Sequence, residues 1–169
     1  MQRLTTRDLE QYEFHRLYSI DLHEAYLTLS LLSRYRRGDI RYVIIRDAVI
    51  SYTRPFSGNR GNAFPSHVLS TSVVPRAMRP LHKELMHLRN RSFAHSDREI
   101  RNPKVARWPT KSGGGLYPMS FTPQPMQDLD RKWREIRALV ESVQEGINTW
   151  TSEWTRQYDL QADFDPQGA

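Results

Sequence analysis

The stretch from Met126 to about Tyr158 places apolar residues at spacings of three and four along its whole length. The apolar positions are Leu129, Trp133, Ile136, Val140, Val143, Ile147, Trp150 and Trp154. This spacing matches the 3.6-residue period of an α-helix and predicts one long helix, with the tryptophans packing on its apolar face. Such a face must be buried against another element, so the rest of the chain has to supply a partner layer.

Two more helices are predicted in the first third of the chain. Residues 6 to about 37 have helical periodicity and predict one long helix, or two in line. Its inner stripe is expected to contain Leu9, Leu17, Ile20, Leu27 and Leu31. Gly38 interrupts this helix, and Asp39 is expected to cap a second one over about 40–52. The second helix ends before Arg54, because a residue that precedes a proline avoids the α region.

A third helix and two irregular segments complete the predicted fold. The helix spans about 76–92, with Met78, Leu81, Leu85 and Leu88 facing inward. Residues 55–75 are rich in Gly, Pro, Ser and Asn and predict a long loop with one short helical turn. Residues 98–124 predict two short strands joined by a glycine-rich turn, and the tail 159–169 is expected to fray. We therefore expect one all-α domain over 1–169: a four- to five-helix bundle with a small β-hairpin-like insertion before the last helix.

Composition narrows the class of protein. The chain has 169 residues, of which 38% are hydrophobic and 26% charged, as in soluble globular proteins. Its richest apolar stretch, 42–52, is interrupted by Arg46 and Asp47, so no membrane span is expected. The absence of cysteine excludes a disulfide framework and a thiolate metal site. The N-terminus also lacks the basic-then-apolar order of a signal peptide, so we expect a cytoplasmic protein. We expect no metal and no cofactor.

The positive charge is concentrated in the middle of the chain. Residues 34–111 carry 17 Lys/Arg against 5 Asp/Glu, whereas 1–33 carry 3 against 5 and 112–169 carry 5 against 9. A basic region of this kind favours contact with a polyanion, because neutralised phosphates release their counterions. Nucleic acid is therefore the expected partner, and an ordinary solvated surface is the alternative.

The end of the predicted third helix concentrates groups suited to acid–base chemistry. The stretch ELMHLRNRSFAHSDREI, residues 84–100, contains Arg89, Asn90, Arg91 and His95. Either arginine approaches His95 if the chain turns after the helix. Imidazole transfers protons at the 2′-hydroxyl or 5′-oxygen of RNA, and guanidinium stabilises the charged phosphorane, so this pairing cleaves RNA without a metal. Taken alone, the same residues also fit a helix C-terminus, where Arg and His complement the dipole.

The segment LRNRSFAHSD resembles the HEPN family (higher eukaryotes and prokaryotes nucleotide-binding domains). The hallmark of that family is an arginine, usually followed by a polar residue, and then a histidine after four to six intervening residues. Here five residues separate Arg89 from His95, and Asn90 fills the polar position. The four-helix layout is similar as well, but the close match is confined to this segment.

The resemblance implies a homodimer in which two such motifs form a composite, metal-independent endoribonuclease site that leaves 2′,3′-cyclic phosphate ends. Arg89 would stabilise the scissile phosphate, His95 would act as general acid or base, and Asn90 would support them. Many family members are toxins of toxin–antitoxin or phage-defence systems. The resemblance thus allows a protein antitoxin or a nucleotidyltransferase as a further partner beside RNA.

Three more residues are predicted to support the motif. Members that a nucleotidyltransferase modifies carry a tyrosine two residues after the histidine, and this chain has Asp97 there. That departure argues against modification and leaves Asp97 to orient His95 or to cap the turn. A buried acid in the second helix is common in the family, which makes Asp47 the candidate partner of Arg89 or His95. An ion pair with a core arginine is the alternative for Asp47, and Arg91 completes the set.

Basic and aromatic residues elsewhere are candidates for RNA contact. They are Arg54, Arg60, Arg101, Lys104, Arg107, Lys111, Trp108 and Tyr117. Aromatic rings interleaved with cations stack on exposed bases. A hairpin that folds over the bundle and buries these rings is the alternative. The runner-up function is a catalytically silent HEPN-like module that binds RNA or a protein through the same surface, and a purely structural bundle is the third possibility.

Overall fold

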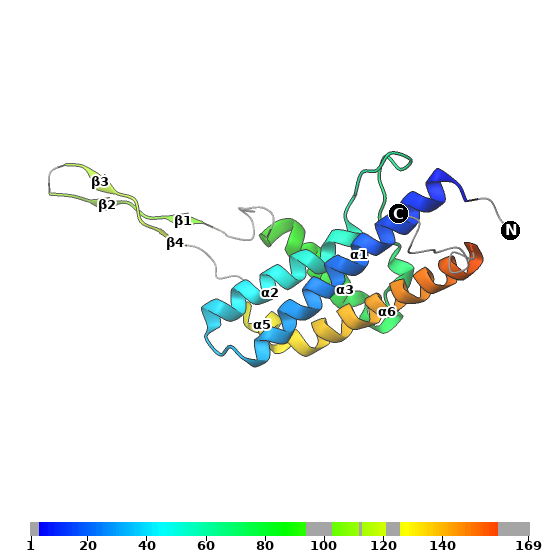
Figure 1. Ribbon diagram of the computed structural model, residues 1–169. Coiled ribbons are helices and arrows are strands. Elements are labelled where there is room, and N and C mark those ends of the chain that lie inside the picture. Colours follow the sequence, from blue (N-terminus) through cyan, green and yellow to red (C-terminus); the bar gives the residue numbers. More distant parts are fainter. Residues whose placement is uncertain (1–3, 94–102, 112, 121–125, 159–169) are drawn as a thin grey trace, which may run out of the picture.

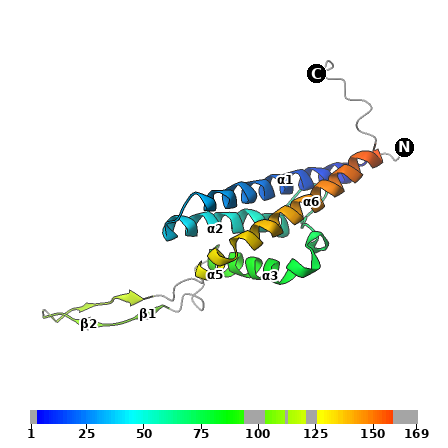
Figure 2. The same ribbon diagram turned by 90° about the horizontal axis from the view of Figure 1, so that it is seen from below.

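The computed structural model describes residues 4–93, 103–111, 113–120 and 126–158 (Figures 1 and 2). Its helices are α1 (Thr6–Ser30), α2 (Gly38–Thr53), α3 (Arg79–Leu88), α5 (Met126–Arg131) and α6 (Trp133–Tyr158). Short 3-10 turns lie at Leu31–Ser33, Arg54–Phe56, Thr71–Val73 and Arg76–Met78, and a π turn lies at Arg89–Phe93. The predicted all-α bundle is confirmed. None of the described helices is long and apolar enough to span a bilayer. The predicted frayed tail, 159–169, lies outside the described residues.

The core lies where α1 packs against both α2 and α6. On the C-terminal helices the side chains predicted to face inward are buried or partly buried, as expected: Leu129, Trp133, Ile136, Val140, Val143, Ile147, Trp150 and Trp154. The predicted single helix is divided at Lys132, which separates α5 from α6. The side chain of Lys132 donates to both carboxylate oxygens of Glu84 at 3.0 Å and so ties this junction to α3.

The side of α1 that faces the core is not the predicted one. The buried residues are Phe14, Tyr18, Leu22, Ala25 and Leu29. The predicted stripe, Leu9, Leu17, Ile20, Leu27 and Leu31, is instead 38–56% exposed. At 3.6 residues per turn the two sets lie on opposite sides of the helix. Because both sides are apolar, the period alone does not choose between them. The choice is made by packing, in which the Tyr18 ring enters the core while its hydroxyl bonds to His67.

Two predictions about α2 were wrong. The helix begins at Gly38, so Asp39 lies in its first turn and pairs with Arg37 at 2.6 Å instead of capping the helix. Asp47 was expected to be buried, but it is exposed. The buried side of α2 contains Ile44, Ile45, Ala48, Val49 and Tyr52. A carboxylate on the outer side needs no buried partner, and Asp47 accepts a long hydrogen bond of 3.4 Å from Thr28.

Segment 55–75 is irregular, as predicted, and is packed onto the bundle. The Glu10 carboxylate on α1 accepts hydrogen bonds from the backbone N–H groups of Asn62, Ala63 and Phe64. Asn59 and His67 exchange two backbone hydrogen bonds of 3.0 and 2.7 Å. Leu69 and Val74 enter the core. The segment is therefore part of the folded body.

The β-ribbon, residues 103–111 and 113–120, projects away from the helices in both views (Figures 1 and 2). Its strands are β1 (Lys104–Val105), β2 (Trp108–Pro109), β3 (Gly115–Leu116) and β4 (Met119–Ser120). They pair antiparallel as β1 with β4 and β2 with β3, and Gly113 makes the turn with φ 85°. The hairpin-like insertion is confirmed. The alternative in which it folds over the bundle is wrong, because Trp108 and Tyr117 are 60% and 63% exposed.

Candidate functional site

Helix α3 leads into the candidate motif, and its inner face is packed against the core. Pro80 lies in the first turn, where a missing N–H costs nothing. Inside, Leu85 is fully buried and His82 Nδ1 lies 2.8 Å from the hydroxyl of Tyr52. Burial lowers the pKa of His82 and raises that of Tyr52, so both groups are neutral near pH 7 and share one hydrogen bond. This hydrogen bond sets the rotation of α3 against α2.

The motif begins where α3 widens into the π turn Arg89–Phe93, which packs against α2. Such turns occur often at functional sites. Arg89 Nη1 donates to Asn90 Oδ1 at 2.9 Å, so the structure brings these two predicted residues together. Asn90 is exposed and Arg89 is half-buried. Because a guanidinium has five N–H donors, one bond to Asn90 leaves others for an anion.

The remaining residues of the predicted motif are only partly covered by the structure. Arg91 lies in the π turn and is half-buried. His95, Asp97 and Arg101 lie outside the described residues. Their roles stay predictions, as does any pairing between Arg89 and His95.

Asp47 and Arg54 lie together on another part of the bundle. Arg54 Nη1 donates to Asp21 at 3.1 Å and to Glu24 at 3.2 Å. Its pKa is raised, mainly by the bond to Asp21 and further by the charges of Glu24 and Asp47. A guanidinium bonded to two carboxylates is poorly placed to bind phosphate. Asp47 makes no contact with Arg89 in the described part of the chain.

The other described candidates for RNA contact are solvent-exposed. They are Arg60, Lys104, Arg107, Lys111, Trp108 and Tyr117. A Cβ placed on Gly115 would lie 3.3 Å from Arg107 Nε and 3.4 Å from Tyr117 Cζ, so these two side chains flank Gly115 on one face of the β-ribbon. The pairing of β1 with β4 and that of β2 with β3 keep the same register. Because side chains alternate between the two faces, Lys104 and Trp108 share the other face. Each face thus combines a cation with an aromatic ring.

One set of exposed residues was missed by the sequence analysis. Arg76, Arg79, Lys83 and His87 lie on the outer side of α3 and the turn before it, and we call them the α3 stripe. Their spacing of three, four and four was available as a signal, because such positions share one helix face.

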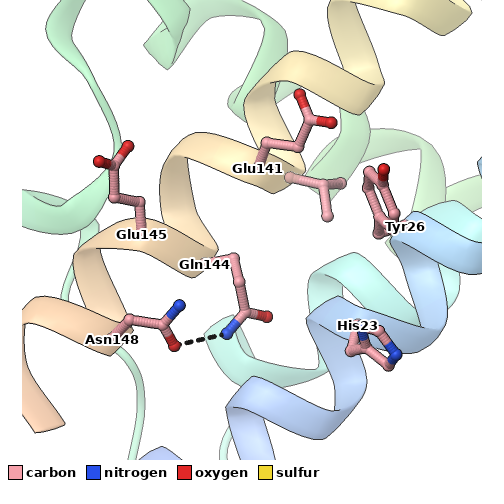
Figure 3. A pocket seen from close by; sticks show the side chains of 7 residues that line it. His23, Tyr26, Glu141, Gln144, Glu145 and Asn148 are labelled. Carbon is pink, nitrogen blue, oxygen red and sulfur yellow. Dashed lines mark hydrogen bonds between the residues drawn. The ribbon is translucent and has the colours of Figure 1, made fainter.

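A pocket of about 340 Å³ lies between α1 and α6 (Figure 3). His23 and Tyr26 line it from α1, and Glu141, Gln144 and Glu145 from α6. Its polar groups bond mainly to protein, for example Gln144 Nε2 to Ser19 at 2.7 Å and to Asn148 at 3.1 Å. No three His, Asp or Glu side chains gather as a metal-ligand set within the described ranges. None of the residues that line the pocket belongs to α3 or to the turn Arg89–Phe93.

Comparison of the chain with protein-family models, curated proteins and solved structures finds no match.

Proposed function

We propose that this chain is a metal-independent endoribonuclease of HEPN type that acts as a homodimer, in the role of a toxin or phage-defence effector. The observation that carries the proposal is the hydrogen bond from Arg89 to Asn90 at the solvent-facing end of α3. This bond orients the guanidinium of Arg89 and leaves N–H donors for a phosphate. His95 follows five residues after Asn90 in the sequence.

The proposed reaction needs only these side chains. His95 of one copy accepts the proton of an RNA 2′-hydroxyl, and the 2′-oxygen attacks the adjacent phosphorus. The bond to the 5′-oxygen breaks, and that oxygen takes a proton from the His95 imidazolium of the second copy. The products are a 2′,3′-cyclic phosphate and a 5′-hydroxyl. Arg89 stabilises the additional negative charge of the phosphorane, with Asn90 holding its orientation.

The β-ribbon supports RNA as the substrate. Between Glu99 and Asp128 the sequence contains no acidic residue, and the ribbon exposes Trp108 and Tyr117 beside Lys104 and Arg107. Unpaired bases stack on such rings, while cations contact the phosphates.

The second candidate function is a catalytically silent module that binds RNA. It is favoured by the same exposed rings and cations, since none of these groups takes part in the proposed proton transfers. Both candidates predict RNA binding, but only the first predicts cleavage that depends on His95.

The decisive experiment follows cleavage of end-labelled single-stranded RNA in EDTA. We expect the wild type to leave 2′,3′-cyclic phosphate ends and His95→Ala to be slower by about 10²–10⁴-fold, the usual contribution of a general acid or base. Arg89→Ala should be similarly impaired. His23→Ala, which alters an exposed histidine on α1, is the matched control and should cleave like the wild type. Equal activity of wild type and His95→Ala would refute the enzyme, and intact binding without cleavage would establish the silent module.

A further inference from the structure

We infer that the α3 stripe is a phosphate-binding track that leads single-stranded RNA to the Arg89–Asn90 motif. The inference rests on the proposed function, because the RNA strand is led to the proposed cleavage site. It adds a binding surface of four residues that the motif itself does not include.

The geometry of α3 arranges the stripe as a line. Arg79, Lys83 and His87 are four residues apart, so each advances about 6 Å along the helix and turns only about 40° around it. Arg76 precedes them in the adjoining 3-10 turn, and exposed Asn90 follows three residues after His87. The line therefore runs along the outer face and ends at the motif. In Figures 1 and 2 this end of α3 lies on the side from which the β-ribbon projects.

The positive charge of the stripe is not neutralised by its neighbours. Arg76, Arg79 and Lys83 are exposed and form no ion pair with any residue in the described part of the chain. The acidic side chain of α3, Glu84, has both oxygens bonded to Lys132. Some cations elsewhere are neutralised, since Arg41 pairs with Asp130 at 2.6 Å and Arg137 with Glu141 at 3.1 Å. A row of unpaired cations attracts a polyanion.

The composition of α3 favours a nucleic-acid strand over a membrane or a protein. A helix that lies on a membrane inserts an exposed apolar face, and protein interfaces centre on buried aromatic or aliphatic anchors. The apolar side chains of α3 are turned inward instead: Leu81, Leu85, Met86 and Leu88 belong to the core or pack against it. A phosphate chain requires only regularly placed cations.

The test measures binding of a short fluorescein-labelled single-stranded RNA by anisotropy, in the full chain carrying His95→Ala so that the RNA stays intact. Binding by this parent chain should weaken roughly 100-fold at 0.1 M salt when three substitutions are added, Arg76→Gln, Arg79→Gln and Lys83→Gln. They should also make the slope of log K against log salt shallower by about 2, because each single-strand phosphate contact contributes about 0.7. The matched control, Arg16→Gln with Arg34→Gln and Arg36→Gln, removes the same charge from exposed positions off the stripe and should change binding by less than about threefold.

A rescue variant protects the test from misfolding. Arg76→Lys with Arg79→Lys retains point charges that contact phosphate, so it should bind RNA nearly as well as the parent. Unchanged binding by the glutamine variant would overturn the inference, and so would an equal loss in the control. Binding of the stripe to phosphatidylserine vesicles with no affinity for RNA would assign it to a membrane and also overturn it.

Failure of the inference and failure of the proposed function are distinguishable. If RNA cleavage in EDTA depends on His95 but the glutamine variant binds normally, only the track is wrong. If the stripe governs binding and cleavage does not depend on His95, only the nuclease is wrong.

Discussion

Segment 55–75 and the β-ribbon are both rich in glycine and proline, but the rest of the molecule holds them differently. Segment 55–75 is fixed to α1 by the Glu10 carboxylate and contributes Leu69 and Val74 to the core. The β-ribbon leaves Val105, Trp108, Leu116, Tyr117 and Met119 more than half exposed. Composition alone therefore does not tell a packed loop from a projecting one. The two segments differ because the buried Glu10 carboxylate accepts hydrogen bonds from the backbone of segment 55–75.

This difference assigns the two segments to different tasks. Residues that fill the core or satisfy buried polar groups stabilise the folded state. Exposed rings and unpaired cations, such as those of the β-ribbon, gain nothing for the folded state and are better explained by binding. Substitutions in segment 55–75 and its contacts should thus change stability, whereas those in the ribbon should change affinity for RNA.

The largest effect is expected for Glu10→Ala. The substitution removes the acceptor of three backbone N–H groups in a largely buried site, so unfolding in urea should become easier by about 2–4 kcal/mol. Glu13→Ala on the exposed side of the same helix is the control and should cost no more than about 0.5 kcal/mol. Equal losses in both variants would show that the carboxylate does not hold segment 55–75.

A smaller effect, on binding alone, is expected for Trp108→Ala. Loss of one stacked base weakens binding by about 1–3 kcal/mol, or roughly 5- to 150-fold in Kd for a labelled single-stranded RNA. The free energy of unfolding should stay within about 0.5 kcal/mol of the wild type, because the ring is 60% exposed. Val105→Ala trims an exposed aliphatic side chain of the same ribbon and should leave Kd nearly unchanged. A drop in stability without a change in Kd would make Trp108 a structural residue.

The contrast also explains which sequence predictions succeeded. The inner faces of α3 and α6 were predicted correctly because each helix is apolar on one side only. On α1 the same method chose the wrong side, since both sides are apolar and Tyr18 is buried by a hydrogen bond to a distant residue, His67. The expected burial of Asp47 was wrong for a related reason, because α2 is mostly apolar but its outer side, which carries Asp47, faces solvent. Packing between segments far apart in sequence decided which side of α1 and of α2 is buried.

The candidate site shows the same limit. The pairing of Arg89 with Asn90 joins neighbours in the sequence and follows from the motif. The binding of Arg54 to Asp21 and Glu24 joins residues on two helices, and no local pattern indicated it. Charge counts along the chain therefore overstated the basic surface at Arg54 and overlooked the α3 stripe, where unpaired charges are regularly spaced.

The smallest expected effect is a dependence of stability on pH. Of the two segments compared, we expect it from segment 55–75 and not from the β-ribbon. Burial lowers the pKa of His67, an effect that the charge of Glu10 partly opposes. The Nδ1 of the neutral ring lies 2.7 Å from the Tyr18 hydroxyl, and the ring stacks on Phe14 at 4.5 Å, so a positive charge on it would be poorly solvated. The unfolded chain binds the proton more readily. The contribution of His67 to stability is therefore complete above about pH 6.5 and is lost as the pH falls through the lowered folded pKa.

Urea midpoints at pH 7.5 and 5.5 test this dependence. His15 and His82 also have pKa values lowered by burial, so the wild type should lose stability between the two values through all three rings. His67→Gln retains a hydrogen-bonding side chain without a titrating ring, and its loss over the same interval should be smaller. His23→Gln, on the exposed side of α1, should lose as much as the wild type. An unchanged loss in His67→Gln would show that His67 does not contribute to the acid sensitivity. A reduced loss would locate part of that sensitivity in segment 55–75. The β-ribbon should contribute none, because its described residues include no histidine.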